Sequence, residues 1–144
     1  MIERSDIFSM SRSISPLFVL IAMLPALLLS GCGGIGFAYK ERLSDKYGLV
    51  AVDILEQMSV CEMLPDGGGV GVINETVFAV GWDEHYIIAK QHPAGDKSIT
   101  YFYILRVSDG TLTGPLDETK FTAERERIGV PAGLSFTLIF DSLK

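Results

Sequence analysis

Residues 77–91 read Val-Phe-Ala-Val-Gly-Trp-Asp-Glu-His-Tyr-Ile-Ile-Ala-Lys-Gln, and this stretch indicates the architecture of the domain. Two apolar runs, Val77–Trp82 and His85–Gln91, flank the polar pair Asp83-Glu84. Runs of this length that are rich in β-branched and aromatic residues are typical of strands, and a short polar break between them is typical of a tight turn. The stretch therefore predicts a pair of antiparallel strands.

Further strands are expected on both sides of this pair. The longest, Ile99–Val107, places Tyr101 and Tyr103 on one face and Phe102 and Ile104 on the other, because side chains alternate along a strand. The other expected strands are Tyr47–Ile54, Val70–Ile73, Thr111–Thr113 and a last strand within Leu134–Phe140. Leu55–Leu64 is apolar without a clear period and stays ambiguous. Short strands joined by turns favour an antiparallel β-meander.

One helix is expected, over Glu118–Ile128. Asp117 is a suitable N-cap, and Gly129 is suitable for a left-handed C-cap. Leu116 and Phe121 stand at the positions of a hydrophobic staple, and Lys120 and Glu124 at the spacing of an i,i+4 ion pair. The predicted fold class is α+β: a small antiparallel β-meander sheet with one C-terminal helix packed on it, preceded by a lipoprotein signal peptide.

The tetrad Leu29-Ser30-Gly31-Cys32 ends an apolar run of 13 residues that follows Arg4 and Arg12. A charged start, an apolar core and small residues at the exit are typical of a secretory signal peptide. The run is shorter than the about 20 residues that a transmembrane helix needs. The tetrad resembles the lipobox of bacterial lipoproteins. The alternative interpretation is a buried cysteine that happens to follow an apolar segment.

The lipobox resemblance implies cleavage between Gly31 and Cys32, a diacylglyceryl group on the Cys32 sulfur and acylation of the freed amine. We expect residues 1–31 to be the signal peptide, 32–39 a lipidated cysteine with a flexible tether, and 40–144 a single β-rich domain. Gly33 replaces the aspartate that retains lipoproteins in the inner membrane, so the resemblance points to the outer membrane if the source has two membranes. With one membrane, the outer face of the cell membrane is expected. Translation from Met10 is an alternative start.

Charge and cysteine content limit the class of partner. Residues 1–31 hold two acids and two bases, so residues 32–144 keep 16 acidic and 10 basic side chains. An acidic domain lacks the basic face that nucleic-acid binding requires, so no nucleic-acid partner is expected. The membrane would then be held through the lipid on Cys32, since an acidic surface is repelled by anionic lipid. Cys61 is the only other cysteine, and its apolar surroundings favour burial.

Three segments carry a resemblance to a known family: residues 77–93, residues 101–105, and Gly114-Pro115-Leu116-Asp117 leading into Phe121. They resemble the core motif of a family of small bacterial lipoproteins with no known function. The similarity covers roughly residues 40–130. The resemblance supplies no activity and no catalytic residues that could be carried over to this chain. No cofactor is expected.

Two groups of side chains are candidates for a site. Trp82, Tyr86, Tyr101 and Tyr103 belong to an aromatic concentration that would suit a binding surface, although core and cross-strand packing is the favoured interpretation. The second group, His85, His92 and Asp96, would be needed for a metal site. The two histidines are seven residues apart and would point to opposite faces of one extended strand, so solvent-exposed loop-end histidines are favoured.

Two hypotheses on function follow. The first is a non-catalytic, membrane-anchored module of the cell envelope that contacts another envelope protein, because no nucleophile, base and oxyanion-stabilising group occur in a matched set. The alternative is an envelope metal-binding protein or enzyme that uses His85, His92 and Asp96.

Overall fold

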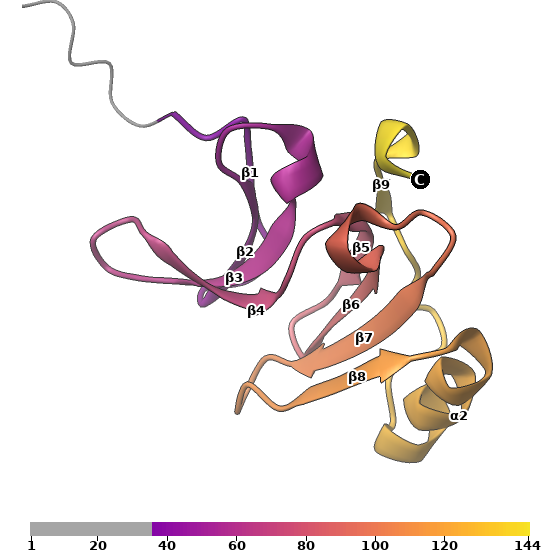
Figure 1. The fold of residues 1–144 in the computed structure, drawn as a ribbon. Helices are drawn as coiled ribbons and strands as arrows, with labels where there is room; N and C mark the ends of the chain where they lie inside the picture. The colour runs from indigo at the N-terminus through magenta and orange to yellow at the C-terminus, as the bar shows by residue number, and fades with distance from the viewer. Residues whose placement is uncertain (1–35) are drawn as a thin grey trace, which may run out of the picture. The chain divides into compact units, whose positions relative to one another are not determined.

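Two antiparallel sheets, rather than the single meander expected, form the domain, and one α-helix completes it (Figure 1). The computed structural model describes residues 36–144. The prediction of a mostly β domain with one helix is confirmed, whereas the prediction of a single sheet is wrong. The signal peptide, the cleavage site at Gly31 and the lipidation site at Cys32 lie outside the described residues. Within them, no helix is both long and apolar enough to cross a membrane.

The N-terminal sheet is a meander of four strands in sequence order. Its strands are β1 (Tyr39–Arg42), β2 (Tyr47–Ala51), β3 (Ser59–Met63) and β4 (Gly69–Ile73). A short 3₁₀ turn, η1 (Leu55–Gln57), precedes β3, so the ambiguous segment 55–64 contains both a turn and a strand. Tyr39, which was assigned to the tether, pairs with Ala51 and is part of this sheet.

The C-terminal sheet has the strand order β8-β7-β6-β5-β9. Its strands are β5 (Val77–Trp82), β6 (Tyr86–Gln91), β7 (Tyr101–Arg106), β8 (Leu112–Leu116) and β9 (Leu138–Ile139). The expected last strand is reduced to two residues, and it pairs with β5 at Ala79 and Val80. The 3₁₀ turns η2 (Pro93–Gly95) and η3 (Asp141–Leu143) lie in the loops around this sheet.

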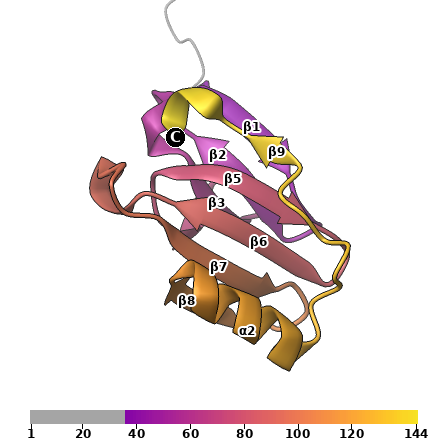
Figure 2. The ribbon, with the colours of Figure 1, turned by 90° about the vertical axis from the view of Figure 1, so that its right-hand side faces the viewer.

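Two hydrophobic clusters define three layers. One cluster joins residues of both sheets, among them Tyr47, Leu49, Val80 and Leu105, so the sheets pack face to face. The other lies between the C-terminal sheet and helix α2 (Glu118–Ile128). Figure 2 shows α2 lying along β7 and β8. The C-terminal sheet is therefore covered on both faces.

Helix α2 begins and ends where the sequence predicts. The Asp117 side chain accepts a hydrogen bond from the Lys120 amide at 2.8 Å, and Gly129 adopts a left-handed conformation with φ of 77°. Phe121 is buried, with its ring centroid 4.9 Å from that of Phe102. The expected Lys120–Glu124 pair is wrong: Lys120 Nζ lies 3.3 Å from the capping carboxylate of Asp117, which offers a nearer partner. Glu124 instead accepts from Arg127.

Loops gather at two opposite ends of the domain. We call one the hairpin end; it consists of residues 43–46, 82–85 and 107–111, which connect β1–β2, β5–β6 and β7–β8. We call the other the tether end; it consists of residues 36–38, 52–57, 92–99 and 140–144. Hydrogen bonds link parts of the tether end, from the Ala38 amide to the Val52 carbonyl at 2.9 Å and from Lys97 Nζ to the Ser142 carbonyl at 3.1 Å.

Candidate binding site

A groove of about 580 Å³ opens at the hairpin end. It lies between the β1–β2 loop and the β5–β6 turn, and Val107 closes one side. We call it the tryptophan groove, because Trp82 supplies its aromatic wall. Its lining residues are Leu43, Ser44, Asp45, Lys46, Trp82, Asp83, Glu84 and Val107.

The β5–β6 turn is shaped by Asp83. One oxygen of its carboxylate accepts hydrogen bonds from the amides of His85 and Tyr86, each at 2.8 Å, and the Asp83 amide donates to the Tyr86 carbonyl at 3.0 Å. Aspartate favours such turns because its short side chain reaches the backbone two residues further on. Glu84 is exposed at the tip of the turn. Asp83 thus fixes the backbone, and Glu84 is left to face solvent or a ligand.

The β1–β2 loop is also held by hydrogen bonds from backbone amides to a side chain. Ser44 Oγ accepts from the amides of Lys46 and Tyr47 at 3.2 and 3.0 Å. Leu43 and Tyr47 are buried on either side of this loop. The loop is therefore anchored into the core at both of its ends, and Leu43 and the polar residues 44–46 line the groove.

The charge of the groove is mainly acidic. Lys46 is its only lysine, and its Nζ lies 3.4 Å from Glu62 on β3. Hydrogen bonds to Tyr47 and to Glu62 raise the pKa of Lys46, so this cation is already partnered. The lining also holds three carboxylates: Asp45 pairs with Arg42, Asp83 holds the β5–β6 turn, and Glu84 is exposed. A groove with one aromatic wall and an acidic rim suits a basic or aromatic side chain of another protein.

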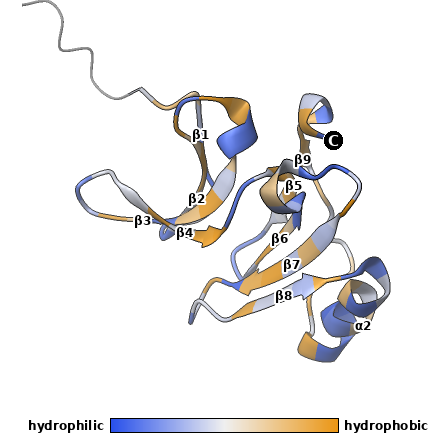
Figure 3. Ribbon diagram, in the orientation of Figure 1, coloured by the Kyte–Doolittle hydropathy of each residue, from blue (hydrophilic) through white to orange (hydrophobic). Residues whose placement is uncertain are grey.

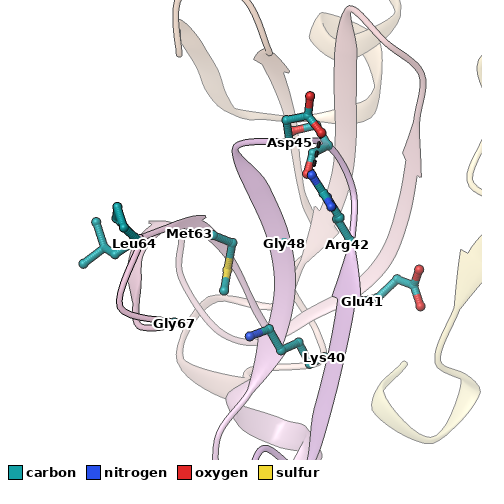
Figure 4. Close-up of a pocket in the computed structure, with 10 residues that line it drawn as sticks. Lys40, Glu41, Arg42, Asp45, Gly48, Met63, Leu64 and Gly67 are labelled. Atoms are coloured by element: carbon teal, nitrogen blue, oxygen red, sulfur yellow. Dashed lines mark hydrogen bonds and ion pairs between the residues drawn. The ribbon is translucent and has the colours of Figure 1, made fainter.

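A second groove, of about 390 Å³, lies on the other side of the β1–β2 hairpin (Figure 4). It is lined from β1, β3 and the β3–β4 turn, and Ser44 and Asp45 line both grooves. In Figure 4 the Arg42 side chain reaches back to Asp45, with which it forms an ion pair. The β1–β2 loop is thus a ridge between two shallow grooves, an arrangement that offers a broad surface rather than a deep pocket.

The four aromatic residues proposed as a binding surface do not lie together. Tyr86 is on the α2 face of the C-terminal sheet, where its hydroxyl donates to the Ile128 carbonyl at 3.0 Å. Tyr101 and Tyr103 are on the opposite face, and the Tyr103 hydroxyl donates to Gln91 Oε1 at 3.2 Å. Burial raises the pKa of Tyr103. Of the four, Trp82 alone lines the tryptophan groove.

The two histidines lie at opposite ends of β6. His85 is exposed in the turn before the strand. His92 follows the strand and is only 4 % exposed, so the expectation that both histidines face solvent is wrong for His92. Its ring stacks on Phe78 at a centroid distance of 4.2 Å, which explains why it is buried. Six strand residues span about 20 Å, so the structure does not bring the two histidines together.

His92 belongs to a small buried polar cluster at the tether end. Its Nδ1 lies 2.7 Å from the Ile99 carbonyl, which accepts only, so Nδ1 carries the hydrogen. Nε2 has no hydrogen-bond partner among the described residues. A space of about 80 Å³ beside His92 is lined by Thr76 and Lys97 among others. Asp96 hydrogen-bonds Ser98, which lowers the pKa of Asp96. Within residues 36–144, no three His, Cys, Asp or Glu side chains lie together as a metal site requires.

Sequence reasoning found one wall of the tryptophan groove and missed the other. The β5–β6 turn was predicted from Asp83-Glu84, whereas the β1–β2 loop was missed because β1 is short and polar and follows a glycine-rich segment. The residues between β1 and β2, Leu43-Ser44-Asp45-Lys46, contain a turn-forming Ser-Asp pair that would have indicated a hairpin. Burial of Cys61 was predicted, and its 7 % exposure confirms it.

Comparison with known protein families assigns the chain to one of them. A family model described as "Protein of unknown function (DUF3997)" matches residues 45–141. The match covers most of the domain, so the chain belongs to this family. No curated protein matches the chain significantly. No solved structure matches it significantly either.

Proposed function

We propose that this protein is a lipid-anchored domain of the bacterial cell envelope that binds another envelope protein through its hairpin end. The observation that carries the anchor is the tetrad Leu29-Ser30-Gly31-Cys32 at the end of the apolar run. A diacylglyceryl group on Cys32 supplies two acyl chains, which is the number that stable anchoring takes. With Gly33 after the cysteine, the outer membrane is the destination where two membranes exist.

The position of the grooves supports binding at the hairpin end. The described chain begins at the tether end, where the Ala38 amide donates to the Val52 carbonyl. The tryptophan groove lies at the opposite end, so it faces away from the point of attachment. Its acidic rim, around Asp45 and Glu84, favours a partner with a basic surface, because complementary charge steers association and selects the partner.

The proposed role is binding rather than catalysis. The carboxylate of Asp83 holds the turn, and Lys46 is paired with Glu62, so these two groups shape the groove. Trp82 offers a rigid aromatic surface, which is the kind of side chain that dominates binding energy at protein interfaces. These features fit recognition of a protein surface.

Site-specific photocrosslinking in native envelopes tests the proposal. A photoreactive residue replaces Val107 in the groove, and a second sample carries it at Thr122 on the exposed side of α2. We expect one discrete crosslinked product from position 107 and none from position 122. Glu84→Lys in the position-107 sample should weaken the product about tenfold, because it opposes a basic partner.

Glu126→Lys on α2 is the matched control for Glu84→Lys, since both glutamates are exposed and the charge change is the same. It should leave the crosslink unchanged. Equal crosslinking from positions 107 and 122, or equal loss with both lysine variants, would contradict binding at the hairpin end. The metal-binding alternative predicts a stoichiometric metal in purified protein that disappears in His85→Ala, and elemental analysis measures it.

A further inference from the structure

The tether end carries a group of exposed apolar side chains where the described chain begins. We call this group the apolar tip. The exposed fractions are 38 % for Phe37, 41 % for Val52, 54 % for Ile54 and 36 % for Leu55. Three of the four lie in the connection between β2 and β3. In Figure 3 this connection is partly orange and partly blue, and it lies close to the start of β1.

The backbone holds this connection beside the start of β1. The Ala38 amide donates to the Val52 carbonyl at 2.9 Å, which places Phe37 next to Val52. The amides of Gln57 and Met58 donate to the carbonyls of Ile54 and Leu55 at 3.1 and 3.0 Å. The turn η1 is thereby closed, and Thr76 Oγ1 ties it to the C-terminal sheet through the Glu56 carbonyl at 2.6 Å. The apolar tip is thus presented by an ordered loop.

The length of chain between Cys32 and the tip decides what it faces. Four residues lie between Cys32 and Phe37, and the five residue steps from one Cα to the other span at most about 18 Å even when fully extended. If the Cys32 sulfur carries diacylglycerol, its Cα lies at the level of the lipid headgroups. The tip is then held within reach of the membrane interface, and the hairpin end lies a full strand length further from the attachment point.

We propose that the apolar tip inserts into the lipid interface and fixes the orientation of the domain on the membrane, with the hairpin end outward. This inference rests on the proposed lipid anchor. Transfer of exposed apolar side chains from water to the acyl boundary lowers the free energy. The lipid anchor already holds the domain at the membrane, so even these weak contacts are sufficient to orient it.

The charges near the tip favour a zwitterionic lipid surface. Asp53 and Glu56 lie in the same connection as Ile54 and Leu55, so anionic headgroups repel this end. Lys40 Nζ lies 4.7 Å from the centre of the Phe37 ring. A lysine in that position keeps its amine among the headgroups while its stem covers the aromatic ring.

Depth-dependent tryptophan quenching tests the inference on the full-length, processed protein. The chain has one natural tryptophan, Trp82 at the hairpin end, which serves as the internal reference. Ile54→Trp adds a reporter at the tip, and Leu112→Trp adds one on β8 near the hairpin end, where Leu112 is 37 % exposed. Each protein is reconstituted in vesicles of phosphatidylcholine, with or without bromine on the acyl chains.

We expect bromine to reduce the added emission of Ile54→Trp about twofold, since interfacial insertion places a side chain about 5–10 Å into the acyl boundary. The emission of wild type and of Leu112→Trp should not change. The same Ile54→Trp reporter in a chain that lacks residues 1–32, and therefore both the apolar leader and the lipid, should not float with vesicles, because the tip is too small to bind alone.

The outcomes separate this inference from the anchor. Protein that floats with vesicles but shows no quenching of Trp at position 54 overturns the inference and leaves the anchor standing. Equal quenching at positions 54 and 112 also overturns it, because the domain then has no fixed orientation. A blue shift at position 54 without quenching assigns the tip to a second copy or another protein instead. Failure of the unmutated protein to float overturns both proposals.

Discussion

The two sheets of this domain differ in how they are covered. The C-terminal sheet packs against the N-terminal sheet on one face and against α2 on the other, and β5 is buried at five of its six positions. The N-terminal sheet has a partner on one face only, and no helix among the described residues covers its outer face (Figure 1). We infer that the C-terminal sheet supplies most of the stability, and that the N-terminal sheet supplies the β1–β2 loop, which lines both grooves.

Removal of the helix contact should have the largest effect. Phe121 is 4 % exposed and packs between Phe102 and Phe136, with centroid distances of 4.9 and 6.0 Å. Phe121→Ala should lower the free energy of unfolding by about 3–4 kcal/mol, as is typical when a buried phenylalanine leaves a cavity. Urea unfolding followed by circular dichroism measures the loss.

Val70→Ala on β4 is the comparison in the N-terminal sheet, where the Val70 side chain is 55 % exposed. It should change the free energy of unfolding by less than about 0.5 kcal/mol. Equal losses for Phe121→Ala and Val70→Ala would contradict the difference between the two sheets.

A pair of glycines gives the next largest contrast. A Cβ added at Gly81 on β5 would clash with the Ser135 carbonyl oxygen, so the segment before β9 would have to move away. A Cβ added at Gly71 on β4 would meet only Asn74 Oδ1, at the ordinary contact distance of 3.6 Å. Gly81→Ala should cost about 2–3 kcal/mol, in the range of overpacked sites.

Gly71→Ala is the control, and thermal unfolding compares the two variants. It should be close to neutral or slightly stabilising, because alanine loses less conformational freedom on folding than glycine does. Equal melting temperatures for the two alanine variants would contradict the difference in packing around Gly81 and Gly71.

The smallest expected effect concerns the cap of α2 and its pH dependence. The hydrogen bond from the Lys120 amide is the main cause that lowers the pKa of Asp117. A carboxyl group whose pKa is lowered by folding stabilises the folded state at pH values above its unfolded pKa of about 3.9. This stabilisation is lost as the pH falls through the pKa of the folded state. Asp117→Asn keeps a capping oxygen and removes the charge.

Melting curves of Asp117→Asn between pH 3 and pH 6 test the cap. At pH 6 the melting temperature of the variant should be a few degrees below that of wild type. Between pH 6 and pH 3 the melting temperature of the variant should fall less steeply than that of wild type. Asp96 and Asp109 also have lowered pKa values through hydrogen bonds to Ser98 and Thr111, so some acid sensitivity should remain. An unchanged pH slope in Asp117→Asn would show that the Asp117 carboxylate does not contribute.

Local features of the fold could be predicted from the sequence. The bounds of β5 and α2, and the roles of Asp117 and Gly129, follow from runs and caps that lie within a few residues of each other. The division into two sheets could not be predicted. A strand such as β2, which is buried at all five positions, has the same apolar sequence pattern whether the domain forms one sheet or two. The chain changes sheets within Asn74-Glu75-Thr76, a segment without any turn signature beyond its polarity.

The candidate site was less predictable than the fold. Trp82 was identified, but the groove depends on its meeting with residues 43–46, a contact between segments almost 40 residues apart. Burial of His92 depends in the same way on its stacking with Phe78 across β5 and β6. Contacts of this kind are set by how the sheets are paired, and the chain pattern alone does not contain that information.

The most direct test of the account is the intact mass of the protein purified from its native membrane. The account predicts a chain that begins at Cys32 and carries a diacylglyceryl group on sulfur, located by fragmentation of the N-terminal peptide. A free thiol at position 32, or a chain that still contains residues 1–31, would contradict it.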